Sequence, residues 1–106
     1  MSYRNFVKAY INPEVKGKDY LLNASMGLAG EAGEFIDAVK KTLFQGHPLD
    51  STKLVNELGD ILFYAELAAI ALNIDTATVR QRNMQKLRAR YPDGFKPAAS
   101  VNRGDK

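Results

Sequence analysis

The segment from Leu54 to Ile74 is apolar around nearly its whole circumference when it is drawn as a helix. A helix of this kind has to be covered by neighbours on several sides. Its length of about 21 residues approaches that of a membrane span, but burial of its polar side chains in lipid would cost several kcal/mol. These polar residues are Asn56, Glu57, Asp60 and Glu66. We therefore expect the centre of a helical bundle and no membrane span.

Apolar spacing predicts two helices before this segment. Tyr3, Phe6, Val7 and Tyr10 follow i, i+3, i+4, i+7, the stripe of a short amphipathic helix that Asn12-Pro13 ends. A long helix is predicted over about residues 20–44, with Asp19 as its N-cap. The turn Gly46-His47-Pro48 stops it.

Two more helices are predicted by capping signals. Asp50 or Ser51 caps the apolar helix, which runs to about residue 73. Asp75 or Thr76 caps a fourth helix that reaches Tyr91, before Pro92 and Gly94. No segment has convincing strand alternation.

These elements predict an all-α fold, a helical bundle of three long helices and a short N-terminal helix. A chain of 106 residues fits one domain, predicted over residues 1–94, and residues 95–106 lack periodicity and are expected to be a flexible tail. Because so few helices cannot bury the apolar helix, we expect oligomerisation, as a homodimer or homotetramer, to complete the bundle.

Composition removes several classes of function. The absence of cysteine excludes disulfides, thiolate metal sites and cysteine nucleophiles. No apolar signal segment follows the charged N-terminus, so a cytoplasmic location is expected. Residues 80–106 carry eight Lys or Arg against two Asp, while the rest carries seven basic and ten acidic residues. A basic segment beside an acidic one suits nucleic acid or a polyphosphate whose metal is bound by the acids.

Two acidic pairs share one spacing, Glu31-Ala-Gly-Glu34 and Glu57-Leu-Gly-Asp60. At i, i+3 the two acids of a pair lie on one helix face and repel. Measured from the intervening turn, Glu34 and Glu31 lie ~15 and ~20 Å down one helix, and Glu57 and Asp60 ~9 and ~14 Å down the next. The four carboxylates are therefore predicted to face each other in an antiparallel hairpin, where a hard divalent cation would offset the repulsion.

The alternative is that these acids form buried salt bridges with Lys53 or an arginine. Asp37, one turn beyond Glu34, is interpreted as an ordinary surface acid in preference to a partner of the metal ligands. His47, the chain's single histidine, is interpreted as a turn residue. Glycines inside helices destabilise them, so those at positions 27, 30, 33 and 59 indicate close approach of a neighbouring helix or a ligand.

Three segments together resemble the MazG-like nucleoside triphosphate pyrophosphohydrolases in their short single-domain form. They are residues 27–34 (GLAGEAGE), 57–64 (ELGDILFY) and 83–92 (NMQKLRARYP). The resemblance covers most of the chain. It implies an all-α, usually oligomeric enzyme that uses Mg²⁺, or Mn²⁺ in its place, to hydrolyse a nucleoside triphosphate (NTP or dNTP) to its monophosphate and pyrophosphate.

By position, the resemblance implies that Glu31, Glu34, Glu57 and Asp60 hold the metal and form the catalytic site. Contacts with the triphosphate are assigned to residues of the third and fourth helices, namely Lys53, Asn83, Lys86, Arg90 and Tyr91. Many relatives have a further glutamate where this chain has Gly30, which leaves the number of metal ions open.

Two other functions remain open at this point. One is a related helical hydrolase acting on phosphoribosyl-ATP, which shares the acidic pairs. The other is a non-enzymatic helical oligomer whose basic fourth helix binds nucleic acid or a protein partner. Of these partners, nucleic acid is not the one that we expect for this chain.

Overall fold

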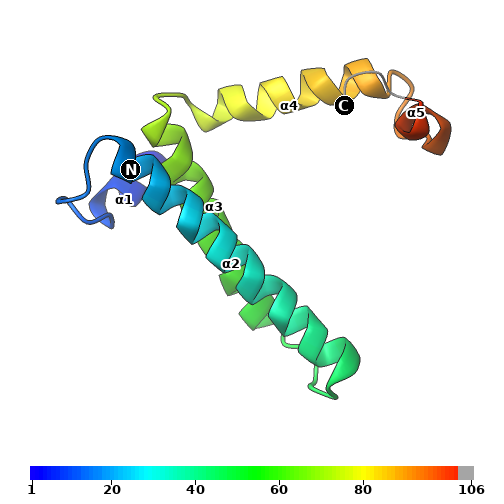
Figure 1. The fold of residues 1–106 in the computed structure, drawn as a ribbon, viewed down its shortest axis with the longest axis horizontal. Helices are drawn as coiled ribbons and strands as arrows, with labels where there is room; N and C mark the ends of the chain where they lie inside the picture. Colours follow the sequence, from blue (N-terminus) through cyan, green and yellow to red (C-terminus); the bar gives the residue numbers. More distant parts are fainter. Residues whose placement is uncertain (103–106) are drawn as a thin grey trace. The chain divides into compact units, whose positions relative to one another are not determined.

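The computed structural model describes residues 1–102, and within them every regular element is a helix (Figure 1). The all-α prediction is therefore confirmed. The helices are α1 (Tyr3–Ala9), α2 (Lys18–Phe44), α3 (Ser51–Ala71), α4 (Thr76–Arg90) and α5 (Pro97–Val101). The chain divides into two compact units, Met1–Asn73 and Ile74–Lys106.

The first unit is an antiparallel hairpin of α2 and α3 with α1 packed on α3 (Figure 1). Val7, Ala24 and Leu67 from the three helices form its fully buried core. A Cβ atom at Gly27 of α2 would overlap the Tyr64 ring of α3, so the predicted close approach is confirmed at this glycine. A Cβ atom at the other helical glycines of this unit, at positions 30, 33 and 59, would meet open space, with no atom within 4 Å.

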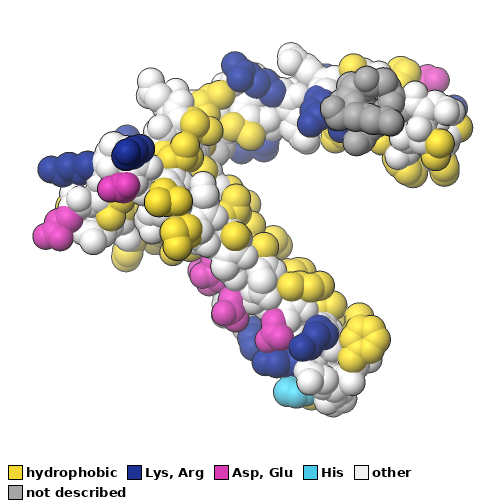
Figure 2. Space-filling model, in the orientation of Figure 1, with side chains coloured by type: hydrophobic (Ala, Val, Ile, Leu, Met, Phe, Trp, Pro, Cys, Tyr) yellow, Lys and Arg dark blue, Asp and Glu magenta, His cyan; other side chains and the backbone are white. Residues whose placement is uncertain are grey.

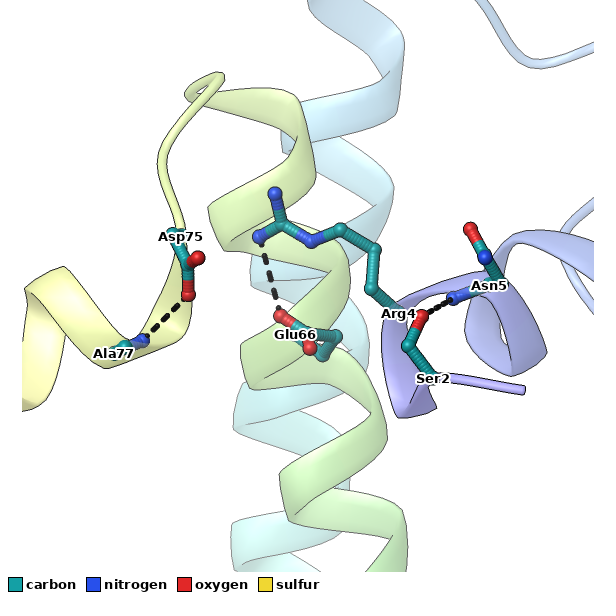
Figure 3. Close-up of polar contacts among 6 residues, drawn as sticks. All are labelled: Ser2, Arg4, Asn5, Glu66, Asp75 and Ala77. Atoms are coloured by element: carbon teal, nitrogen blue, oxygen red, sulfur yellow. Dashed lines mark hydrogen bonds and ion pairs between the residues drawn. The ribbon is translucent and has the colours of Figure 1, made fainter.

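Side-chain caps define three of the helix starts. Asp50 Oδ1 accepts a 3.1 Å hydrogen bond from the Lys53 amide at α3, and Asp75 Oδ1 accepts one of 2.8 Å from the Ala77 amide at α4. Both helices therefore begin at a predicted cap. Ser2 caps α1 in the same way, with 3.2 Å between its Oγ and the Asn5 amide nitrogen (Figure 3).

The predicted cap of α2 was wrong. The N-cap is Gly17, whose φ of +61° turns the chain into the helix without a side-chain hydrogen bond. Asp19 lies inside the first turn, where its charge still complements the positive end of the helix dipole.

An ion pair fastens α1 to α3. Arg4 Nη2 lies 3.2 Å from Glu66 Oε2, and the Glu66 side chain is only 7% exposed (Figure 3). Glu66 interrupts the apolar sequence of α3, and its charge is balanced by a residue 62 positions earlier. The pair explains how a charged residue is accommodated beside Leu67 in the core.

The hairpin leaves much of α3 uncovered. Val55, Leu58 and Leu62 are 66%, 49% and 57% exposed, whereas burial is concentrated near residues 66–69. Within the described residues no single helix is long and apolar enough to cross a membrane, and α3 and α4 meet that length and composition only when taken together across their break.

The second unit contains α4 and α5. The Tyr91 and Phe95 rings between them lie 5.2 Å apart. The sequence predicted no helix over Pro97–Val101, where α5 forms with Pro97 in its first turn, a position that proline suits. The flexibility of the 95–106 segment stays a prediction, and residues 103–106 lie outside the described part of the chain.

Candidate metal centre

Three carboxylates from the two hairpin helices converge on one point. Glu31 of α2 and Glu57 and Asp60 of α3 each offer an oxygen atom, and all three oxygens lie within 4.8 Å of one another. Glu31 and Glu57 are half-buried and Asp60 is exposed. The i, i+3 spacing puts Glu57 and Asp60 on one face of α3, and the antiparallel packing of α2 brings Glu31 against them.

The charges in this group are unbalanced. The pKa of Glu31 is raised above its ordinary value, first by partial burial, then by a hydrogen bond with Glu57, and then by the negative charges of Asp60, Glu57 and Glu34. Within residues 1–102, none of these four acids forms an ion pair with a lysine or arginine. The salt-bridge alternative is therefore not observed in this part of the chain.

Glu34 lies outside the group of three. It is exposed and one helical turn closer to the hairpin tip than Glu31, yet near enough for its charge to raise the pKa of Glu31. Its assignment as a metal ligand stays a prediction. The next acid along α2, Asp37, is paired with Lys41 at 3.0 Å and Lys40 at 3.8 Å. A hydrogen bond from Lys41 holds the pKa of Asp37 below its usual value, in keeping with an ordinary surface acid.

The donor set fits a hard divalent cation. Mg²⁺ and Mn²⁺ prefer oxygen ligands, and carboxylates on facing helices are a recurrent way of binding them. When three carboxylates lie this close together without a cation, their mutual repulsion favours protonation of one of them. The raised pKa of Glu31 agrees with this effect. A bound cation would replace that proton.

The sequence did not identify Tyr3 as a neighbour of this site. Burial raises the pKa of the Tyr3 hydroxyl, and the charges of Glu66 and then Asp60 raise it further. Tyr3 directly precedes Arg4, so the Arg4–Glu66 ion pair, which fastens α1 to α3, also keeps Tyr3 near α3. No local signal links residues so far apart in the sequence.

The residues predicted to contact substrate lie in both units. Lys53 is exposed on α3, one turn before Glu57 on the side of the hairpin tip. The others are on α4 or at its C-cap in the second unit, where Asn83, Lys86 and Arg90 follow i, i+3, i+7 and Tyr91 ends the helix. Their contacts with substrate stay predictions. His47 lies in the exposed loop between α2 and α3, as expected of a turn residue.

Comparison with known proteins agrees with the resemblance of residues 27–34, 57–64 and 83–92 to a known family. Residues 21–95 match the family model of the MazG nucleotide pyrophosphohydrolase domain. The chain belongs to the MazG family. It is also 36% identical over 93 residues to the Gene 37 protein of Mycobacterium phage L5, an alignment that covers 84% of this chain and 79% of that protein. No solved structure matches.

Membership in the MazG family confirms the resemblance inferred from the sequence. The matched region contains both acidic pairs and the residues of α4 predicted to contact substrate. It supports nucleotide pyrophosphohydrolase activity in general, a hydrolase reaction on a nucleotide that typically depends on a divalent metal.

Proposed function

We propose that this MazG protein hydrolyses a nucleoside triphosphate, an NTP or dNTP, to its monophosphate and pyrophosphate, with Mg²⁺ bound by Glu31, Glu34, Glu57 and Asp60. The observation that carries this proposal is the convergence of Glu31, Glu57 and Asp60 within 4.8 Å without a balancing lysine or arginine among the described residues. Mn²⁺ would suit the same oxygen ligands, and one or more ions are compatible with the proposal.

The carboxylates would serve two purposes. Those of Glu57 and Asp60 provide fixed negative charge on one face of α3, which binds the cation and thereby the phosphate chain. Bound Mg²⁺ would neutralise negative charge on the phosphates and help to orient water. A carboxylate of the group would accept the proton of the attacking water as its oxygen bonds to phosphorus and pyrophosphate leaves.

Glu31 suits the role of proton acceptor better than an isolated glutamate. A general base works best when its pKa lies near the operating pH, and the surroundings of Glu31 move its pKa upward from the ordinary value for glutamate. Lysine and arginine side chains, among them Lys53, Lys86 and Arg90, would stabilise the charge that develops on pyrophosphate. Asn83 and Tyr91 would complete the contacts with substrate.

Oligomerisation belongs to the same proposal. Five small or apolar positions of α2 follow alternating spacings of four and three residues, and all are exposed: Leu22, Met26, Ala29, Gly33 and Ile36. The exposed Leu43 lies seven residues after Ile36, and the charged Lys40 occupies the position between them. Such a repeat is typical of a seam between helices. Gly33 on this seam would permit close approach of a second copy, which would also cover α3. Light scattering on a gel-filtered sample is expected to give a homodimer or homotetramer, and a monomer at micromolar concentration would contradict it.

The test of function is a substrate panel. Purified protein is incubated with ribo- and deoxyribonucleoside triphosphates and with phosphoribosyl-ATP, with Mg²⁺, with Mn²⁺ or with a chelator, and pyrophosphate is measured. We expect metal-dependent pyrophosphate release from at least one nucleoside triphosphate. Turnover of phosphoribosyl-ATP alone would favour the related hydrolase, and salt-dependent DNA binding without any hydrolysis would favour a nucleic-acid-binding role.

A further inference from the structure

A pocket of about 260 Å³ lies at the tip of the α2–α3 hairpin and does not include the converging acids. Its walls come from the last turns of α2, the connecting loop and the first turn of α3. Its polar lining includes Lys41, Thr42, His47 and Lys53, together with the cap residue Asp50. The volume is below the roughly 300–1,000 Å³ of pockets for whole small-molecule ligands, so it suits a small ion or one end of a larger ligand.

The groups at this pocket favour an anion. Lys41, Lys53 and His47 line it, and their side chains carry hydrogen-bond donors suited to phosphate oxygens, although the Lys41 ammonium group also pairs with Asp37. The hydroxyl of the lining residue Thr42 donates to the Ala38 carbonyl at 3.4 Å. The one acidic lining residue, Asp50, already accepts the Lys53 amide as the cap of α3. The Lys41 carbonyl, which faces the loop at the end of α2, accepts the amides of Gln45 and His47 at 3.1 Å.

Three lysines lie near Asp37, which does not itself line the pocket. Its carboxylate lies 3.0 Å from Lys41 Nζ, and the charges of Lys41, Lys40 and Lys53 all act on it. Three lysines around Asp37 and the capping Asp50 leave a net positive charge at the tip. Lys53 forms no ion pair within residues 1–102, so its ammonium group is available to a ligand.

The pocket continues the polar stripe that contains the acids. Lys53 precedes Glu57 by four residues, about 6 Å of helix, and lies on the same face of α3. Figure 2 shows the resulting order along the hairpin, where acidic side chains are followed toward the tip by basic ones and then by the chain's single histidine. A phosphate chain aligned with this stripe would have one end at the acids and the other at the lysines.

We propose that the hairpin-tip pocket binds the two terminal phosphates of the substrate and retains them as pyrophosphate after hydrolysis, with Lys41 and Lys53 as the charged contacts. The inference rests on the proposed function for its choice of ligand. The anion-binding property itself is independent of hydrolysis. His47, which lines the same pocket, adds an imidazole N–H donor.

The probe is inorganic pyrophosphate, titrated without divalent metal at constant ionic strength into protein whose purification tag has been removed. His47 is the chain's single histidine, so its imidazole Hε1 resonance in a proton NMR spectrum reports on the pocket without labelling. We expect a saturable shift of this resonance. Lys41→Met and Lys53→Met are each expected to weaken binding about tenfold or more, because each removes a charge-assisted hydrogen bond.

Lys40→Met is the matched control. This substitution removes the same charge from the adjacent position of α2. The Lys40 side chain pairs with Asp37 at 3.8 Å and does not line the pocket. Its pyrophosphate affinity is expected to stay within about twofold of the parent value. Equal weakening by all three substitutions would indicate net charge alone and would overturn the proposed pocket.

The outcomes separate this inference from the proposed function. Hydrolysis of a triphosphate without any shift at His47 would overturn the pocket and leave the enzyme intact. A lysine-dependent shift in a protein that hydrolyses no nucleotide would support the anion site and reject the proposed function. Circular dichroism of each variant shows that loss of binding is not loss of fold.

Discussion

Acidic residues on α3 occur in two different settings. Near its C-terminal end, Glu66 is buried and lies 3.2 Å from Arg4 of α1. About two turns earlier, Asp60 and Glu57 lie with Glu31 in a partly exposed group that has no lysine or arginine partner among the described residues. A carboxylate balanced within the chain contributes to packing, whereas carboxylates left to repel one another require a cation from outside.

The largest expected effect is on catalysis. Glu57→Gln and Asp60→Asn each remove a metal ligand and are expected to lower Mg²⁺-dependent pyrophosphate release at least about 100-fold, since even residues that only support metal ligands contribute about 10–100-fold. Release is measured at saturating nucleotide, and circular dichroism checks the fold.

Asp19→Asn is the control for these substitutions, because Asp19 is an exposed acid in the first turn of α2. Its activity is expected to equal that of the parent. Unfolding of the Glu57 and Asp60 variants, in place of inactivation, would erase the distinction between the two settings and assign these acids to the packing.

The second effect is on stability. Arg4→Met leaves Glu66 buried without its guanidinium and is expected to lower the free energy of unfolding by about 1–3 kcal/mol, a range reduced because the Arg4 side chain is 29% exposed. Urea denaturation monitored by circular dichroism measures it. Activity per folded molecule is expected to change little.

The double substitution Arg4→Met with Glu66→Leu tests the reason for that loss. It removes both charges and is expected to recover part of the stability, because apolar groups of similar size often replace a buried ion pair well. Equal stability of the single variant and the parent would show that Glu66 does not depend on Arg4.

The smallest effect concerns pH. The raised pKa of Glu31 means that the folded, metal-free protein binds this proton more tightly than the unfolded chain. Its contribution to stability is therefore fully present below the unfolded pKa and is lost as pH rises through the folded pKa. Thermal melts across acidic to neutral pH with a chelator are expected to show this decline, and Glu31→Gln is expected to flatten it.

Saturating Mg²⁺ is expected to reverse this pH trend in the parent protein, because the metal binds the ionised carboxylates and stabilises the folded state by mass action. Glu31→Gln is expected to lose most of that stabilisation. A parent and a variant with identical pH profiles and identical metal responses would contradict the assignment of Glu31.

Local rules predicted most of the helical architecture. The caps Asp50 and Asp75 and the stop near Phe44 depend on short-range hydrogen bonds and backbone preferences, which the sequence reveals directly. The start of α2 was missed because Gly17 sets it through its positive φ, while Asp19 offered a more conventional cap two residues too late. The short α5 was missed because five residues carry too little periodicity to detect.

The candidate site was predicted only in part. Counting residues from the hairpin turn placed the two acidic pairs at similar depth, and Glu31, Glu57 and Asp60 do converge. The sequence did not predict that Glu34 lies outside the group, because this depends on the relative rotation of two packed helices. Nor did it predict the Arg4–Glu66 pair or the place of Tyr3, which arise from contacts between distant segments.

The most direct test of the account is anomalous diffraction from crystals grown with Mn²⁺, which locates the ion independently of activity. We expect a strong anomalous peak within bonding distance of oxygens from Glu31, Glu57 and Asp60, and its disappearance in crystals of Asp60→Asn. Ordered carboxylates with no peak among them, or held instead by lysine or arginine side chains, would contradict it.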